Sequence, residues 1–147
     1  MCGLTGFIDF TRNKGEDALR EKVGMMAETL RHRGPDDDGA WADAKTGVAL
    51  GFRRLSIIDL TTQGHQPMIS ASARHVIVFN GEVYNFSELR DELASTGVHF
   101  KGSSDTEVIL EAIEAWGLEK ALRRFIGMFA IALWDRKERT LHLVRDR

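Results

Sequence analysis

The sequence predicts an α+β fold in which mostly antiparallel β-sheets are covered by helices. Apolar, β-prone segments stand near both ends of the chain, at 4–10 and 128–134. Several segments between them have the hydrophobic spacing of amphipathic helices. The last two predicted strands, 128–134 and 140–144, are joined by a short polar turn, which is typical of an antiparallel hairpin.

The first third of the chain alternates between strands and one helix. The apolar residues of 16–31 recur at helical spacing, so this segment is predicted to be a helix with one apolar face. The segment 31–39 breaks the pattern, because Gly-Pro followed by three aspartates is typical of a loop. Strands are predicted at 4–10, 39–43 and 47–53, and a loop around 61–67.

The middle of the chain contains an uninterrupted apolar run at 76–79, as expected of a strand covered on both faces. Asn80 and Gly81 follow at once, and this pair alone predicts a tight hairpin turn. Asn85, with a glutamate three residues later, predicts the start of a helix that ends at Gly97.

A second helix start lies at Ser104-Asp105-Thr106-Glu107, which has the pattern of a capping box. The apolar residues after it continue at helical spacing as far as Trp116. A short helix at 118–125 is then predicted before the last two strands.

Composition limits the possible functions. With 147 residues, 43% of them hydrophobic and 29% charged, the chain is expected to form one globular domain, 1–147. A net charge of −2 argues against binding to nucleic acid or to an anionic membrane. A single cysteine excludes an intramolecular disulfide and favours the cytoplasm, and the five histidines have no metal-binding spacing, so no metal site is expected.

That single cysteine, Cys2, becomes the N-terminal residue if Met1 is removed. An N-terminal cysteine carries a thiol nucleophile and its own α-amine, whose unperturbed pKa of about 7.7–8.0 suits a proton acceptor near neutral pH. The alternative is an inert thiol, which is the more common state of a lone cysteine.

Six motifs, taken together and in order, identify a family. The motifs are Met-Cys-Gly-x-x-Gly at 1–6, Arg-His-Arg-Gly-Pro-Asp at 31–36, Arg-Leu-Ser-Ile-Ile-Asp at 54–59, Gln-Pro-Met at 66–68, Phe-Asn-Gly-Glu-Val-Tyr-Asn at 79–85 and Ser-Asp-Thr-Glu at 104–107. With these motifs the chain resembles the glutaminase domain of glutamine-hydrolysing asparagine synthetases, a class II amidotransferase of the N-terminal-nucleophile hydrolase type.

The resemblance implies a four-layer αββα sandwich, in which two antiparallel sheets stack between helices and which continues beyond Arg147. It also implies that Cys2 attacks the side-chain amide of L-glutamine, releasing ammonia and leaving a thioester that water hydrolyses. Asn80 and Gly81 would then form the oxyanion hole, in a turn that rigidly aims their donors.

The substrate-binding residues are also implied by the resemblance. Arg54 would bind the α-carboxylate of glutamine, and Glu82 and Asp105 would lie near its α-ammonium group. As alternatives, Arg54 is a surface arginine and Asp105 only complements a helix N-terminus. The residues expected to line the glutamine pocket are Leu55, Ser56, Ile57 and Ile58.

The implied partner is an ATP-dependent synthetase domain, in the same polypeptide or complex, that uses the ammonia for asparagine biosynthesis. No cofactor is expected in 1–147 itself, because ATP and Mg²⁺ belong to that synthetase half. A homodimer of the full-length protein is possible. Two alternatives stay open: an acceptor other than aspartate, such as a sugar acid, or a non-catalytic regulatory paralogue that retains Met1.

Overall fold

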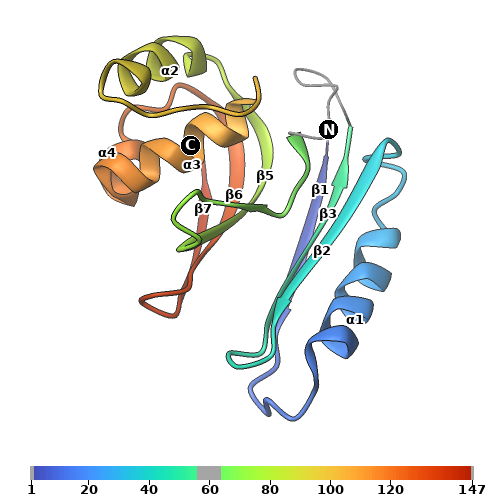
Figure 1. The fold of residues 1–147 in the computed structure, drawn as a ribbon. Helices are drawn as coiled ribbons and strands as arrows, with labels where there is room; N and C mark the ends of the chain where they lie inside the picture. Colours follow the sequence, from blue (N-terminus) through green and yellow to red (C-terminus); the bar gives the residue numbers. More distant parts are fainter. Residues whose placement is uncertain (1, 56–63, 147) are drawn as a thin grey trace. The chain divides into compact units, whose positions relative to one another are not determined.

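The computed structural model describes residues 2–55 and 64–146 (Figure 1). They form two compact units, each with its own sheet and at least one helix. The N-terminal unit contains residues 2–55 and His65–Pro67, and the C-terminal unit contains Gly64 and 68–146. None of the described helices is long and apolar enough to cross a membrane.

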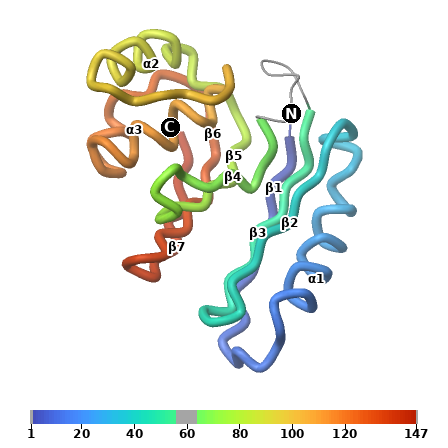
Figure 2. The backbone as a smooth tube through the Cα atoms, in the orientation of Figure 1, coloured from blue at the N-terminus to red at the C-terminus, as the bar shows by residue number. Residues whose placement is uncertain are grey.

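The N-terminal unit is a three-stranded antiparallel sheet of order β1-β3-β2 with α1 packed on one face (Figure 2). Alternating small and apolar side chains of β2 and β3 meet the apolar face of the helix, where Leu19 and Val23 are almost fully buried. The elements are β1 (Gly3–Ile8), α1 (Glu16–Glu28), β2 (Asp37–Asp43) and β3 (Val48–Arg54).

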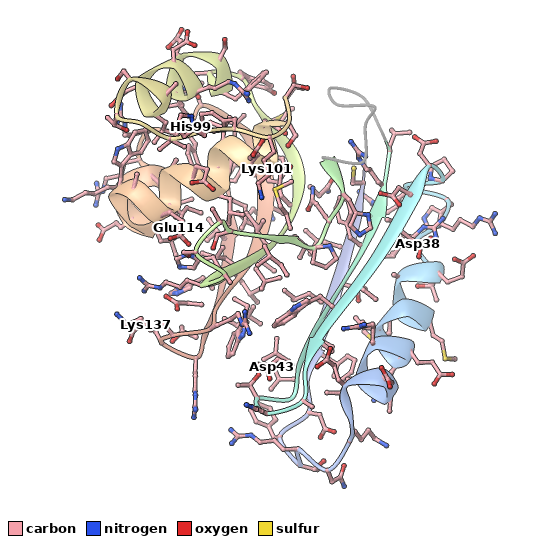
Figure 3. The ribbon with its side chains drawn as sticks, in the orientation of Figure 1. Asp38, Asp43, His99, Lys101, Glu114 and Lys137 are labelled. Atoms are coloured by element: carbon pink, nitrogen blue, oxygen red, sulfur yellow. The ribbon has the colours of Figure 1, made fainter. Side chains whose placement is uncertain are left out.

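The predicted loop at 31–39 is wrong at its end, because Asp37 and Asp38 already belong to β2. Aspartate has a low intrinsic preference for strands, but these residues pair across the sheet with Arg54 and Arg53. The carboxylate of Asp38, labelled in Figure 3, lies 3.3 Å from the Arg53 guanidinium. Cross-strand pairing of opposite charges therefore outweighs the local turn signal.

The C-terminal unit is a four-stranded antiparallel sheet of order β4-β5-β6-β7. The apolar faces of α2 and α3 pack with β5 and β6 in its core, which includes Phe79, Leu93, Ile109 and Ile131. The elements are β4 (Met68–Ile69), β5 (His75–Val83), α2 (Phe86–Ser95), α3 (Asp105–Trp116), α4 (Leu118–Leu122), β6 (Gly127–Asp135) and β7 (Thr140–Arg145).

The predicted turn at Asn80-Gly81 is wrong, because β5 continues through both residues to Val83 and stays paired with β6. Gly81 has a φ of 150°, and a Cβ placed on it would lie 2.1 Å from the carbonyl oxygen of Met128. Glycine is thus required here by the close approach of β6 and not by a reversal of the chain.

The two predicted helix starts have different outcomes. Ser104 caps α3 as expected, with its side chain accepting a hydrogen bond from the Glu107 N–H. Asn85 precedes α2 but makes no side-chain cap. Its side chain instead accepts from the Ile126 N–H at 2.9 Å and donates to the Arg124 carbonyl at 3.0 Å, so it joins the start of α2 to the chain before β6.

All strand pairs among the described residues are antiparallel, which confirms the predicted α+β class. The stacking of the two sheets in four layers stays a prediction, as does the description of 1–147 as one domain.

Asp135, at the end of β6, is 4% exposed and receives hydrogen bonds from several directions. The Arg74 guanidinium donates from Nε at 3.1 Å and from Nη2 at 2.6 Å, and the N–H groups of Lys137 and Glu138 also donate to this carboxylate. Burial raises the pKa of Asp135, but these hydrogen bonds outweigh burial and hold the pKa well below its usual range.

As a first prediction, Asp135→Asn should lower the free energy of unfolding at pH 7 by about 2–4 kcal/mol, because Arg74 loses its nearer charged partner and keeps Glu138 at 3.9 Å. Because the pKa of the folded state is lowered, the contribution is present above pH ~4 and decreases as the pH falls further. Urea unfolding at pH 7 and pH 3 measures it, with Asp91→Asn on the exposed side of α2 as control. Equal effects of the two substitutions would contradict this role.

Candidate active site

Cys2 lies immediately before β1 and is held by the end of β3. The N–H of Leu55 points at its Sγ at 3.3 Å, and Sγ is 3.6 Å from the Leu55 carbonyl oxygen. The Arg33 Nε donates to the Cys2 carbonyl oxygen at 3.1 Å. The half-buried thiol is therefore fixed in direction, with a backbone donor available to a sulfur that carries negative charge.

Gly3 allows this arrangement by letting the chain after α1 approach closely. A Cβ on Gly3 would lie 2.9 Å from the Cβ of Leu30, a distance that real side chains do not tolerate. The segment that follows Leu30 includes Arg33, whose guanidinium holds the Cys2 carbonyl. The glycine after the cysteine is therefore required by packing.

Arg53 and Arg54 are neighbours on β3 whose side chains point to opposite faces of the sheet. Arg53 is committed to structure, because it donates to the Gly34 carbonyl and pairs with Glu28 and Asp38. Arg54 is the last residue of the strand and only 8% exposed, so it is not an ordinary surface arginine. Its carbonyl accepts from the N–H of Asp36 at 3.0 Å, which connects the motif at 31–36 to the end of β3.

The C-terminal unit brings together Asn80, Gly81, Glu82 and Asp105. The first three follow one another on β5, where Asn80 is partly exposed and the next two residues are exposed. Asp105 opens α3 and accepts a hydrogen bond from the N–H of Val83 at 3.2 Å, which joins the start of the helix to the end of the strand.

Asp105 is 5% exposed, and its burial raises the pKa of the carboxyl group to about 6. Hydrogen bonds from the N–H groups of Val83 and Thr106 oppose this shift, whereas the charge of nearby Glu82 adds to it. Asp105 and Glu82 carry like charges, and Asp105 is desolvated, so a cationic group bound between them would stabilise both carboxylates. This is the chemistry expected of a site for an ammonium group.

The second prediction is that Asp105→Asn makes the folded state more stable at pH 8, by up to about 3 kcal/mol for a shift of about two pKa units. Because the folded-state pKa is raised, wild-type stability decreases as the pH rises from about 4 to about 6 and stays lower above that. The asparagine oxygen can still accept from Val83. Urea unfolding at pH 8 and pH 4 tests this, since the gain should disappear at the lower pH.

The same substitution should raise the KM for glutamine while changing kcat little, because an α-ammonium group would lose a charged partner and the reacting carbon would not. A loss of stability at pH 8 would instead show that the Asp105 charge is needed for folding and would contradict the assignment.

The predicted site residues thus lie in two groups. Cys2, Arg54 and Leu55 are neighbours in the N-terminal unit, and the second group comprises Asn80, Gly81, Glu82 and Asp105. Ser56, Ile57 and Ile58 lie outside the described residues. The roles of all of these residues stay predictions.

The role of Arg33 in holding the Cys2 carbonyl was not predicted from the sequence. The available signal was its place in the motif at 31–36, but the contact joins residues far apart in the chain. Within the described ranges, no group of three His, Cys, Asp or Glu side chains could hold a metal ion.

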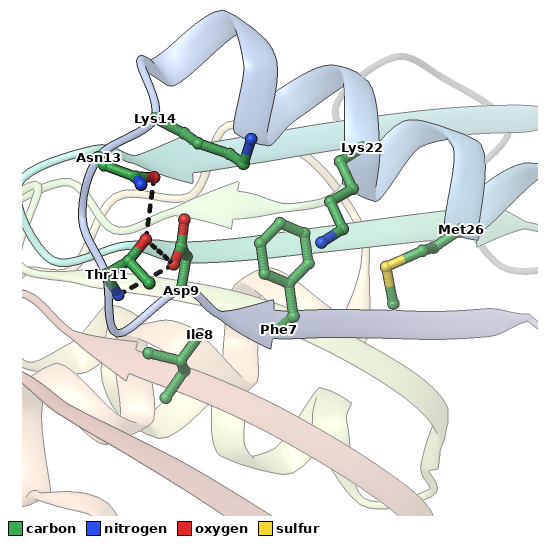
Figure 4. A pocket seen from close by; sticks show the side chains of 8 residues that line it. All are labelled: Phe7, Ile8, Asp9, Thr11, Asn13, Lys14, Lys22 and Met26. Carbon is green, nitrogen blue, oxygen red and sulfur yellow. Dashed lines mark hydrogen bonds between the residues drawn. The ribbon is translucent and has the colours of Figure 1, made fainter.

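A surface hollow of about 520 Å³ lies at the other end of β1 from Cys2 (Figure 4). Phe7, Ile8 and Asp9 contribute to it, and the Lys22 ammonium lies 4.8 Å from the centre of the Phe7 ring. At about 3.3 Å per strand residue, the hollow is well over 10 Å from the thiol. None of the predicted site residues lines it.

Comparison with known proteins identifies the family to which the chain is similar. A family model described as a glutamine amidotransferase domain matches residues 1–147. The chain is 41% identical over 148 residues to glutamine-hydrolysing asparagine synthetase 2 of Bacillus subtilis, and 38% identical over 149 residues to asparagine synthetase 3 of the same organism. It is 34% identical over 154 residues to the amidase chry2 of Gibberella zeae.

These relatives are much longer than the chain. The match covers 100% of this chain in each case, but only 19%, 23% and 23% of the respective relatives. The chain therefore spans about a fifth to a quarter of their length.

A solved structure of glutamine phosphoribosylpyrophosphate amidotransferase from B. subtilis, complexed with ADP and GMP, has the same fold, with a TM-score of 0.70. The likeness covers 95% of this chain and 36% of that one at 19% identity. The family match over the whole chain and the shared fold confirm the resemblance on which the site was predicted. The chain belongs to the glutamine amidotransferase domain family.

Proposed function

We propose that residues 1–147 hydrolyse the side-chain amide of L-glutamine to glutamate and ammonia, with Cys2 as the nucleophile. The observation that carries this proposal is the placement of Cys2, second in the sequence and with the Leu55 N–H 3.3 Å from its sulfur. The arrangement holds a thiol in one direction at the position that becomes the N-terminus when Met1 is removed.

In the first half of the reaction, the α-amine of Cys2 takes the thiol proton as sulfur bonds to the amide carbon of glutamine. The carbonyl becomes an oxyanion, and its collapse breaks the carbon–nitrogen bond. The α-amine returns the proton to the leaving ammonia. Water then attacks the γ-glutamyl thioester, and its proton passes through the same amine to sulfur.

The other predicted site residues are proposed to stabilise charge. The Asn80 side chain and the Gly81 N–H are the proposed donors to the oxyanion, and β5 holds both on a paired strand. Asp105 and Glu82 are the proposed partners of the α-ammonium group, and Arg54 is the proposed partner of the α-carboxylate. Protonation of Asp105 should then make glutamine binding weaken as the pH falls below about 6.

The ammonia is proposed to serve an ATP-dependent synthetase half, in the same polypeptide or complex, that makes asparagine from aspartate. The names and lengths of the B. subtilis relatives support this partner. ATP and Mg²⁺ would act in that half, a homodimer of the full-length protein is compatible with this scheme, and the single cysteine is consistent with the cytoplasm.

A second candidate acceptor is another carboxylate, such as a sugar acid, since a relative at 34% identity is not named as an asparagine synthetase but as an amidase. The same glutaminase chemistry can supply ammonia for a different carboxylate. Incubation of the full-length protein with ATP, glutamine and either aspartate or other carboxylates distinguishes the two acceptors.

The glutaminase proposal itself is tested by measuring ammonia and glutamate from purified protein expressed from its complete reading frame. Equal amounts of both products from L-glutamine are expected. Protein that lacks Met1, binds glutamine and releases no ammonia would contradict the proposal and favour a regulatory role.

A further inference from the structure

The segment 98–104 joins α2 to α3 and ends directly before Asp105, the proposed partner of the glutamine ammonium group. His99 and Lys101, labelled in Figure 3, lie on this segment. It contains no helix or strand of its own, so other contacts must fix its conformation. Because Asp105 follows this segment directly, the conformation of the segment bears on the position of the Asp105 carboxylate.

Arg90 of α2 reaches across to this segment. Its Nη2 donates to the carbonyl oxygen of Gly102 at 2.8 Å, and its guanidinium lies 4.3 Å from the centre of the Phe100 ring. The planar guanidinium is suited to stack on an aromatic face and donate at its edge at the same time. One side chain therefore fixes both Phe100 and Gly102.

Glu107 of α3 holds the same segment from the other side. One carboxylate oxygen accepts from the Lys101 N–H and the other from the Gly102 N–H, each at 2.8 Å. Three consecutive residues, from Phe100 to Gly102, are thus held between a cation on one helix and an anion on the next. Capping of α3 does not account for these contacts, because the Ser104 side chain already caps the helix.

The burial of the Arg90 guanidinium also favours a role in holding this segment. Arg90 Nη1 is buried and has no hydrogen-bond partner among the residues that the structure describes. Burying part of a guanidinium without a partner is unfavourable, and an apolar side chain could fill the same space on α2. A role in fixing the segment before Asp105 accounts for an arginine here.

We propose that Arg90 is a positioning residue for glutamine: with Glu107, it fixes the segment 98–104 so that the Asp105 carboxylate is aimed at the substrate ammonium group. This inference rests on the proposed function of Asp105. It assigns Arg90 no contact with the substrate. Misplacement of a binding group by a fraction of an ångström is enough to weaken its interaction with an ammonium ion.

The test compares Arg90→Met with Arg123→Met in the protein expressed from its complete reading frame. Methionine keeps an unbranched apolar side chain and removes the guanidinium. Arg123 is an exposed arginine of the same unit, paired with Glu119 one helical turn away, so it controls for loss of an arginine. We expect Arg90→Met to raise the KM for glutamine about tenfold with kcat within about twofold, and Arg123→Met to change neither.

Two further variants separate positioning from general destabilisation. Glu107→Gln should also raise KM, and its effect in the double variant with Arg90→Met should be smaller than the product of the single effects, because both residues act on one segment. Arg90→Lys should recover only part of the affinity, since an ammonium group cannot stack and donate in the same geometry.

Hydrogen exchange at the Val83 amide supplies a readout that does not depend on activity, because this N–H is bonded to Asp105. Exchange should be faster in Arg90→Met than in Arg123→Met. Unchanged KM and unchanged Val83 exchange in a folded Arg90→Met protein would overturn the inference, as would equal losses in kcat and affinity. A wild-type protein with no glutaminase activity would instead contradict the proposed function, while the exchange result still tests the positioning of Asp105.

Discussion

Replacing Cys2 with alanine is expected to abolish glutamine hydrolysis and to leave the fold intact. The thiol is the only protein group that bonds to substrate carbon in the proposed mechanism, so its loss should lower kcat by about 10⁴-fold or more. The side chain precedes β1 and is half-buried, so the free energy of unfolding should change by about 1 kcal/mol or less. Ammonia release and urea unfolding measure the two effects.

Cys2→Ser is the matched control for this substitution. Serine is similar in size, can accept from the Leu55 N–H and also becomes N-terminal when Met1 is removed. Because a hydroxyl is a weak nucleophile at neutral pH, this variant should also lose activity while it keeps the local hydrogen bond. An alanine variant that retains more than about a hundredth of wild-type kcat would show that another residue is the nucleophile.

Asn80→Ala is expected to lower kcat by about 10²–10³, equivalent to about 2.7–4 kcal/mol of transition-state stabilisation, with little change in KM. The proposed oxyanion develops only during the reaction, in the transition state and the tetrahedral intermediate, so its donor should not affect binding of the ground state. Asn80 is partly exposed on β5, so its truncation should change stability by only about 0.5 kcal/mol. Steady-state kinetics of the variant give both constants.

Asn85→Ala is the control, because this asparagine belongs to the same motif but bonds to the backbone of Arg124 and Ile126. It should lower stability by about 1–2 kcal/mol and leave kcat unchanged. If Asn85→Ala lowered kcat and Asn80→Ala only lowered stability, the two asparagines would have been assigned the wrong roles.

Most elements of the fold could be predicted from local pattern alone. The apolar runs of β5 and β6 and the capping box of α3 are strong signals, and each lies within a few residues of its predicted place. The errors occurred where long-range pairing opposes a local turn signal. Asn80-Gly81 looks like a turn in isolation, but pairing with Ala130 and Phe129 of β6 keeps it in a strand.

Fewer residues of the candidate site could be predicted from local sequence patterns. The chemistry of Cys2 follows from its position in the chain, whereas Arg54, Asn80 and Asp105 were identified only through the resemblance to a family. Arg33 and Arg90 were missed because their roles come from contacts with residues distant in sequence or on another element. No periodicity or local motif encodes such contacts.

If an N-terminal Cys2 forms a thioester with glutamine, the mass of the protein should change during turnover. The enzyme is mixed with L-glutamine, quenched in acid within the first turnovers and digested for mass spectrometry. We expect a protein without Met1 that carries one γ-glutamyl group on the peptide beginning with Cys2. A fully active protein that retains Met1, or a γ-glutamyl group on any other residue, would contradict this mechanism.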